Sequence, residues 1–308
     1  MSNPIPNIPG LMLGTAMWGW TVDPKECFAL LDCFYESGNR KVDCATNYPI
    51  DKNTVHFRLA ENILLEWIKA HQVTDLQVNM KIGSLNNLKS PEHNLSKSFL
   101  MMNMGDYLQR FQSNLYGLMV HWDKRETESA IEKTMEALNL FRENGLTPGL
   151  SGIKNPQVYA KLNQPYSLEF DIQIKHNLLH SDYHRYVEFH KKKRFYTYGI
   201  NAGGIKLDQD AYRENSSLQA RSGQVQLPSG LIPNLIKIKE EANKIKGRQA
   251  LSTMNHFGMI FAYYQPDVKG ILLGTSRIDQ LKSSLEFYKI LGEADYSDVY
   301  RLQKSRDF

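Results

Sequence analysis

The sequence contains little cysteine, no long apolar run and no large excess of one charge. Its three cysteines, Cys27, Cys33 and Cys44, include no C-x-x-C pair, which argues against a disulfide framework or a cysteine zinc site. No stretch approaches the roughly 18 apolar residues of a membrane span, and residues 1–9 lack the basic and apolar regions of a secretory signal. We therefore expect a cytoplasmic protein that does not associate with membranes.

The charge balance also argues against nucleic acid as a partner. The formal net charge is only +4, far from the concentrated basic face of a nucleic-acid binder. The densest basic run, residues 190–194, is expected at the C-terminal end of a helix, where the helix dipole favours cations. A patch for an anionic ligand is the alternative interpretation. No pattern assigns an oligomeric state.

What the chain does have is an alternation of short apolar runs with longer segments of helical period. Its 308 residues fit one large α/β barrel or two ordinary domains, and no repeat, low-complexity tract or linker marks a boundary. Eight strands, enough to close a barrel, are expected near residues 11–16, 41–43, 77–81, 115–121, 147–151, 171–175, 195–198 and 268–273. We predict a single-domain (β/α)8 TIM barrel spanning residues 1–308.

Two helices and one long loop can be placed between these strands. Asp23-Pro24 predicts a helix start with Gly38 as its end, and residues 126–143 carry apolar side chains at helical spacing before Asn144-Gly145. Residues 206–233 are polar, follow the seventh strand and contain several glycines and prolines. They are predicted to form a long loop over the barrel mouth, either a substrate or cofactor flap or plain disorder.

Four polar residues occur at or just after the second, third and fourth predicted strands. They are Asp43, Tyr48, Lys81 and His121. In an α/β barrel the loops after successive parallel strands converge on one face, so these side chains are expected to meet in a single site. Taken singly, each could be a cap, a surface charge or a packing residue. Their combination predicts an enzyme.

The same residues carry a resemblance to the aldo-keto reductase family, which extends over nearly the whole chain. Residues 43–48, Asp-Cys-Ala-Thr-Asn-Tyr, resemble the family's D-x-A-x-x-Y signature, and residues 13–16 are similar to its opening glycine motif. Lys81 and His121 fall where the family has its strand-end lysine and histidine. The resemblance implies carbonyl reduction with a nicotinamide dinucleotide bound without a Rossmann domain, and no G-x-G-x-x-G occurs between a strand and a helix.

Chemical reasoning gives each of the four residues a task. Hydride transfer to a carbonyl leaves charge on oxygen, and Tyr48 is predicted to supply the proton. Lys81 is expected to lower the pKa of Tyr48, and Asp43 to keep Lys81 charged. His121 would hydrogen-bond the carbonyl oxygen and orient it.

The resemblance also implies a set of cofactor-binding residues. They are Ser151, Gln173, Tyr198, Gly203, Gly204, Gly274, Thr275, Ser276, Arg277, Gln280 and Ser284. Arg277 at a helix start suits a 2′-phosphate, which favours NADPH, although NADH remains possible and Arg277 could be only an exposed helix residue.

Several positions depart from the family pattern. Gly152 stands where the family usually has Asn, Ser283-Ser284 replace its Glu-Asn pair, and Pro49 replaces a glycine after the tyrosine. Pro49 predicts a stiffer loop after Tyr48, whereas the changes at positions 152 and 283–284 predict weakened cofactor contacts. The changes at 152 and 283–284 also leave open a non-catalytic alternative, an NADPH-binding barrel that acts as a redox sensor on a partner protein.

Aromatic residues are expected to line the substrate pocket. Trp18, Trp20 and Trp122 follow the first and fourth strands, where they would form an apolar wall for a small carbonyl substrate, with core packing as the alternative.

His180, His184 and Glu188 recur every four residues and would share a helix face. Because that helix would pack outside the barrel, we expect a polar face and no metal site.

Overall fold

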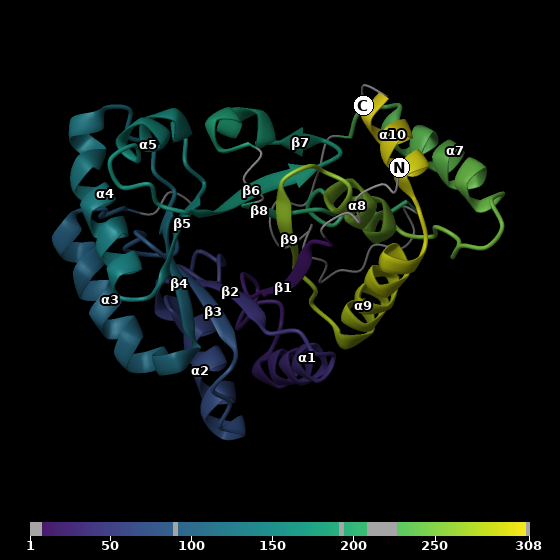
Figure 1. Ribbon diagram of the computed structural model, residues 1–308. Coiled ribbons are helices and arrows are strands. Elements are labelled where there is room, and N and C mark those ends of the chain that lie inside the picture. The colour runs from purple at the N-terminus through teal and green to yellow at the C-terminus, as the bar shows by residue number, and fades with distance from the viewer. Residues whose placement is uncertain (1–7, 89–91, 191–193, 208–226, 306–308) are drawn as a thin grey trace.

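The molecule is a closed barrel of parallel strands surrounded by helices. The computed structural model describes residues 8–88, 92–190, 194–207 and 227–305. Figure 1 shows the strands in the centre and the helices around them. The barrel strands are β1 Gly10–Gly14, β2 Lys41–Ala45, β3 Gln77–Ile82, β4 Leu115–His121, β5 Thr147–Ser151, β6 Asp171–Asn177, β8 Phe195–Tyr198 and β9 Val268–Leu273.

Strand pairing closes the barrel in sequence order. β1 to β5 pair successively in parallel, β5 pairs with β6, and β8 and β9 complete the ring back to β1. Each strand expected from the sequence is present, with ends shifted by two residues or fewer. The predicted single-domain (β/α)8 barrel is therefore confirmed.

The helices lie between the strands and cover the barrel. They are α1 Pro24–Glu36, α2 Leu59–His71, α3 Lys97–Phe111, α4 Glu128–Glu143, α5 Pro156–Leu162, α7 Leu231–Asn243, α8 Met254–Tyr263, α9 Ile278–Glu293 and α10 Ser297–Ser305, with short 3-10 turns η1 Thr54–His56, η2 Gln112–Asn114 and η3 Tyr183–Phe189.

The local sequence explains why α1 begins at Pro24, where the sequence predicts a helix start. Asp23 accepts a hydrogen bond from the Glu26 amide at 3.0 Å, Pro24 opens the first turn, and Leu30 and Phe34 are fully buried. Each fully buried side chain of this size contributes about 1.5–3 kcal/mol.

One predicted helix is wrong. His180 lies in a short strand, β7 His180–Ser181, that pairs antiparallel with the end of β6, and only η3 follows it. The reason is Asn177, whose side-chain oxygen accepts the amides of Leu179 and His180 and so turns the chain back on itself. His180, His184 and Glu188 therefore do not share one helix face.

The predicted loop over the mouth lies mostly outside the described residues. Residues 208–226 are not described, and α7 begins at Leu231, so the last three residues of the expected 206–233 loop are helical. The basic run at 190–194 likewise falls partly on undescribed residues. Arg194, which is described, pairs with Glu169 at 2.5 Å.

Strand register brings polar side chains to one level inside the barrel. His121 pairs with Ser151 and Ser151 with Gln173 across β4, β5 and β6. Since parallel strands of a barrel end on the same face, this level opens to the loops that carry the remaining candidate residues.

Candidate active site

A buried ion pair lies at the centre of the barrel mouth. Lys81 and Asp43 are 1% and 2% exposed, and the Lys81 ammonium contacts the Asp43 carboxylate directly. Burial opposes the charged form of Lys81, but the neighbouring Asp43 carboxylate and the Tyr48 phenol prevail and raise the pKa of Lys81. Lys81 is therefore a permanent cation, as the sequence predicts.

Tyr48 lies on the loop after β2, directly above this pair. The Lys81 Nζ atom is 4.8 Å from the centroid of the Tyr48 ring. The Tyr48 backbone is fixed by its amide bonding to the Ala45 carbonyl at 3.1 Å and its carbonyl accepting the Ala60 amide at 3.2 Å. Both main-chain groups of Tyr48 are thus tied to the fold.

The expectation that Tyr48 has a lowered pKa is wrong for this structure. Burial raises the pKa of Tyr48, and although the Lys81 charge lowers it, the net shift is upward. Desolvation of a phenolate outweighs one neighbouring ammonium here, because Asp43 offsets part of that ammonium's field. The Tyr48 phenol is therefore neutral at physiological pH and carries a proton it can donate.

His121 closes the other side of this cluster. Its ring meets the Tyr48 ring edge-on, with centroids 6.3 Å apart and planes at 86°. Burial, the Lys81 charge and His93 all hold the pKa of His121 well below its usual range, so the imidazole is neutral. Its Nδ1 atom is buried and has no hydrogen-bond partner among the described residues. We call Asp43, Tyr48, Lys81 and His121 the β2–β4 rim.

Gln173 and Ser151 extend the β2–β4 rim across the barrel interior. The Gln173 amide donates to Asp43 Oδ1 at 2.5 Å, and the Ser151 hydroxyl donates to Gln173 Oε1 at 3.4 Å. Both residues are buried. A continuous hydrogen-bonded series therefore runs from Ser151 through Gln173 and Asp43 to Lys81, so Gln173 also orients the carboxylate that holds Lys81.

Gly152 has a structural explanation that the sequence does not provide. Gly152 has φ +67°, and a Cβ atom there would lie 2.4 Å from Cδ1 of Trp122. The Trp122 indole lies against His121, with ring centroids 4.4 Å apart and ring planes tilted by 35°. The indole therefore fills the space that any side chain at position 152 would need, which accounts for glycine there.

The three tryptophans predicted for the substrate pocket lie in different surroundings. Trp18 is fully buried in the hydrophobic core, whereas Trp20 and Trp122 keep partial exposure. His93, in the loop after β3, lies 5.9 Å from Trp122 between ring centroids. Sequence reasoning missed His93, because no motif marks that loop.

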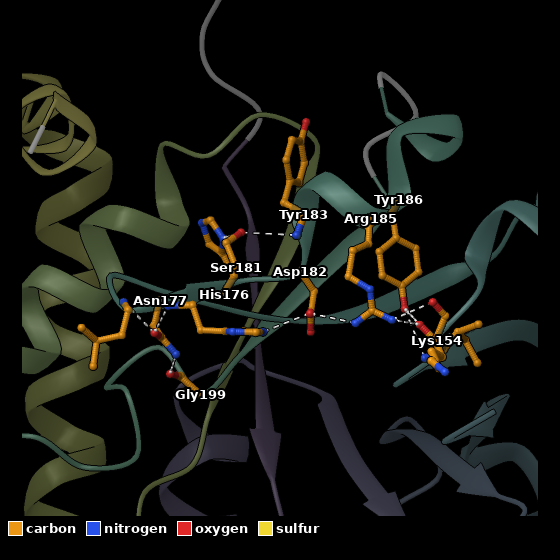
Figure 2. Close-up of polar contacts among 12 residues, drawn as sticks. Lys154, His176, Asn177, Ser181, Asp182, Tyr183, Arg185, Tyr186 and Gly199 are labelled. Atoms are coloured by element: carbon orange, nitrogen blue, oxygen red, sulfur yellow. Dashed lines mark hydrogen bonds and ion pairs between the residues drawn. The ribbon is translucent and has the colours of Figure 1, made fainter. Parts of the chain in front are cut away.

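Polar side chains of the β6–β7 hairpin and of η3 contact the loops after β5 and β8, as Figure 2 shows. Asn177 donates to the Gly199 carbonyl at 2.9 Å, which fixes the chain just after β8. Arg185, paired with Asp182, donates to the carbonyls of Ile153 and Lys154 at 2.7 and 2.9 Å. The hairpin thus ties the loops after β5 and β8 together.

Glycines and polar groups follow β8 and β9. Gly203 and Gly204 have φ +89° and +103°, and a Cβ atom at Gly274 would meet nothing within 4 Å. The Thr275 hydroxyl is buried with no hydrogen-bond partner among the described residues. We call Gly203, Gly204 and residues 274–280 the β8–β9 rim. The open space at Gly274 leaves the main chain there accessible to a ligand.

Other polar side chains near the β8–β9 rim are engaged within the protein. Ser284 is buried and donates to the Gln280 carbonyl at 2.8 Å, and the Gln280 side chain accepts from Ser276 at 3.4 Å. Arg277 pairs with Asp279. Tyr198, at the end of β8, is partly exposed, and burial raises its pKa.

In the described part of the chain, no group of three or more His, Cys, Asp or Glu side chains could hold a metal ion. Within the same residues, every helix is too short or too polar to cross a membrane.

Comparisons with known proteins agree with this geometry. The Aldo/keto reductase family model matches residues 10–306. The chain is 22% identical over 291 residues to the protein named "Probable aryl-alcohol dehydrogenase AAD4" of Saccharomyces cerevisiae, covering 88% of this chain and 85% of that protein. It is 34% identical over 80 residues to an "Uncharacterized 11.2 kDa protein" of Pseudescherichia vulneris, covering 25% of this chain and 78% of that protein.

Proposed function

Because the chain belongs to the aldo/keto reductase family, which makes it an oxidoreductase of carbonyl compounds, we propose that it reduces an aldehyde to an alcohol with Tyr48 as the proton donor. The observation that carries the proposal is the β2–β4 rim. A neutral phenol, a buried ammonium and a neutral imidazole converge there on one end of the barrel. These groups are what a carbonyl oxygen requires as it gains negative charge.

Each residue of the β2–β4 rim has a separate task. Tyr48 holds the transferable proton, and Lys81 stabilises the phenolate that remains after the transfer. Asp43 keeps Lys81 charged and in place. His121 is neutral, so it can donate a hydrogen bond to the carbonyl oxygen without placing a second cation beside Lys81.

The upward pKa shift of Tyr48 keeps its phenol protonated at neutral pH, which is the form that reduction requires. A phenol that stays protonated is ready to donate, which suits reduction, whereas alcohol oxidation begins with a phenolate. We therefore expect aldehyde reduction to dominate at neutral pH, with alcohol oxidation rising as the pH is raised.

A nicotinamide dinucleotide supplies the hydride when it is bound. The residues that would hold it are those predicted from the sequence. Ser151 and Gln173 would meet the carboxamide, Tyr198 the ring, and the β8–β9 rim the phosphates. Gly203 and Gly204 support this arrangement, since their positive φ values allow close backbone approach.

Aromatic aldehydes are the proposed substrate class. Trp20 and Trp122 are partly exposed, and Trp122 lies against His121, so an aryl ring placed against them would bring its carbonyl toward Tyr48. The printed name of the yeast relative, an aryl-alcohol dehydrogenase, supports the same class.

The test is turnover of a panel of aromatic and aliphatic aldehydes with NADH and with NADPH, followed by the absorbance of the reduced nicotinamide. We expect aromatic aldehydes to be reduced faster than aliphatic ones of similar size. Tight dinucleotide binding with no turnover of any aldehyde would contradict the proposal and favour the redox-sensor alternative.

A further inference from the structure

The first main-chain amide of α9 donates a hydrogen bond to a carboxylate from another helix. The Ile278 amide donates to Glu26 Oε1 at 2.8 Å, and Arg277, at the N-cap position, makes no side-chain cap of its own. Glu26 lies in the first turn of α1, which packs beside α9 (Figure 1). Residues 252 positions apart in the sequence are thus joined at the β8–β9 rim.

The guanidinium of Arg277, in the same segment, is also paired with a carboxylate. Arg277 donates through Nε and Nη2 to both oxygens of Asp279, at 2.9 and 2.7 Å. The hydrogen bond from Arg277 lowers the pKa of Asp279 to about 2, so the carboxylate is charged at neutral pH. The start of α9 therefore carries two carboxylates, Glu26 and Asp279, around one guanidinium.

This arrangement determines which anion the rim accepts. Loops after the last two strands of a barrel, with a helix N-terminus, form a common phosphate site. Here the helix dipole and the guanidinium are already compensated internally. A further phosphate with roughly two negative charges, brought beside Glu26, would be repelled.

We propose that Glu26 makes this enzyme select the dinucleotide without a 2′-phosphate, NADH, over NADPH. The inference rests on the proposed function, since it takes the β8–β9 rim to hold the adenosine end of the cofactor. It reverses the NADPH preference expected from Arg277 in the sequence. The alternative is that Glu26 serves only as a cap that joins α1 to α9.

The experiment measures equilibrium binding, not turnover. Dissociation constants for NADH, NADPH and the fragment adenosine 2′,5′-bisphosphate are determined for the wild type and for Glu26→Gln. The glutamine keeps an acceptor oxygen for the Ile278 amide and removes only the charge. Glu36→Gln, at the exposed far end of α1, is the matched control.

We expect the wild type to bind NADH about tenfold more tightly than NADPH, because the Glu26 carboxylate would repel the added phosphate. In Glu26→Gln this ratio should fall about tenfold, and adenosine 2′,5′-bisphosphate should bind more tightly. Glu36→Gln should change neither. Asp279→Asn leaves the Glu26 contact intact and should shift the ratio in the same direction by less, which keeps the test available if Glu26→Gln is unstable.

Two results would overturn the inference while leaving the proposed function intact. One is a wild-type preference for NADPH, and the other is an unchanged NADH to NADPH ratio in Glu26→Gln. If neither dinucleotide binds the wild type, the proposed function fails and the inference fails with it.

Discussion

The β2–β4 rim and the β8–β9 rim lie at the same end of one barrel and are built in opposite ways. In the first, charged groups are buried and paired with each other, with Lys81 and Asp43 at 1% and 2% exposure. In the second, the charged pair is partly exposed, with the side chains of Arg277 and Asp279 at 36% and 65%. The first is held rigid by its own charges, while the second is open to solvent.

This difference separates a site suited to acid–base chemistry, the β2–β4 rim, from a site suited to ligand recognition, the β8–β9 rim. A buried ion pair fixes the position and charge of Lys81 before any ligand arrives, as acid–base chemistry requires. The exposed pair contributes little to the stability of the fold, so the β8–β9 rim can change through few substitutions. We expect variants at the β2–β4 rim to have large effects and those at the β8–β9 rim to have small, ligand-specific ones.

The largest effect is expected for Tyr48→Phe. Removing the hydroxyl removes the proposed proton donor, so kcat for aldehyde reduction should fall by about 10²–10⁴-fold, as is usual for a lost general acid. Dinucleotide affinity should stay within about twofold, because the β8–β9 rim is untouched. Steady-state kinetics and binding titration measure the two quantities, and near-normal kcat in this variant would remove Tyr48 from the mechanism.

Lys81→Met should destabilise the fold strongly. It leaves the buried Asp43 carboxylate without its cation, and breaking a buried pair in this way costs about 3–5 kcal/mol of the free energy of unfolding. Urea denaturation measures the loss. Lys133→Met is the control, because Lys133 pairs with Glu136 at the surface with 66% of its side chain exposed, and such pairs are worth about 0–1 kcal/mol. Equal losses in the two variants would contradict the comparison.

The sequence predicted the barrel and the β2–β4 rim because their signals are local. Buried parallel strands form short apolar runs, and Asp43, Tyr48, Lys81 and His121 each stand at or just after such a run. Convergence of these residues then follows from the topology. The net pKa shift of Tyr48 was predicted with the wrong sign, because the balance between burial and the Lys81 charge depends on packing that the sequence does not contain.

Features that depend on tertiary contacts could not be predicted. Glu26 reads as an ordinary first-turn acid of α1, and only the fold brings it to the Ile278 amide. In the sequence, Gly152 indicates a lost cofactor contact. In the fold, the Trp122 indole fills the space that a side chain at position 152 would need. Asn177 turned a predicted helix into a hairpin through side-chain contacts to the main chain.

Gly152→Ala tests how tightly the β2–β4 rim is packed. The new methyl group would lie 2.4 Å from Trp122 Cδ1, so the indole must shift. Overpacking of this kind costs about 1–3 kcal/mol. Gly145→Ala is the matched control, since Gly145 also has positive φ but nothing within 4 Å of its Cβ position. The two variants share the backbone cost, and the difference in their urea denaturation should isolate the clash.

The smallest expected effect is a pH dependence of stability caused by His121. Burial, Lys81 and His93 lower its pKa in the folded protein, whereas in the unfolded chain it titrates near its reference value of about 6.5. Below about pH 6.5 the unfolded state binds a proton that the folded state does not, so stability falls as the pH falls, by at most about 1.4 kcal/mol per pH unit. His121→Gln should remove this contribution and flatten the curve of unfolding free energy between pH 6.5 and 5. The slope in His184→Gln, which replaces an exposed histidine, is the reference. An unchanged slope in His121→Gln would mean that the imidazole gains its proton over the same pH range in the folded and unfolded protein, and the β2–β4 rim would then hold two adjacent cations below about pH 6.5.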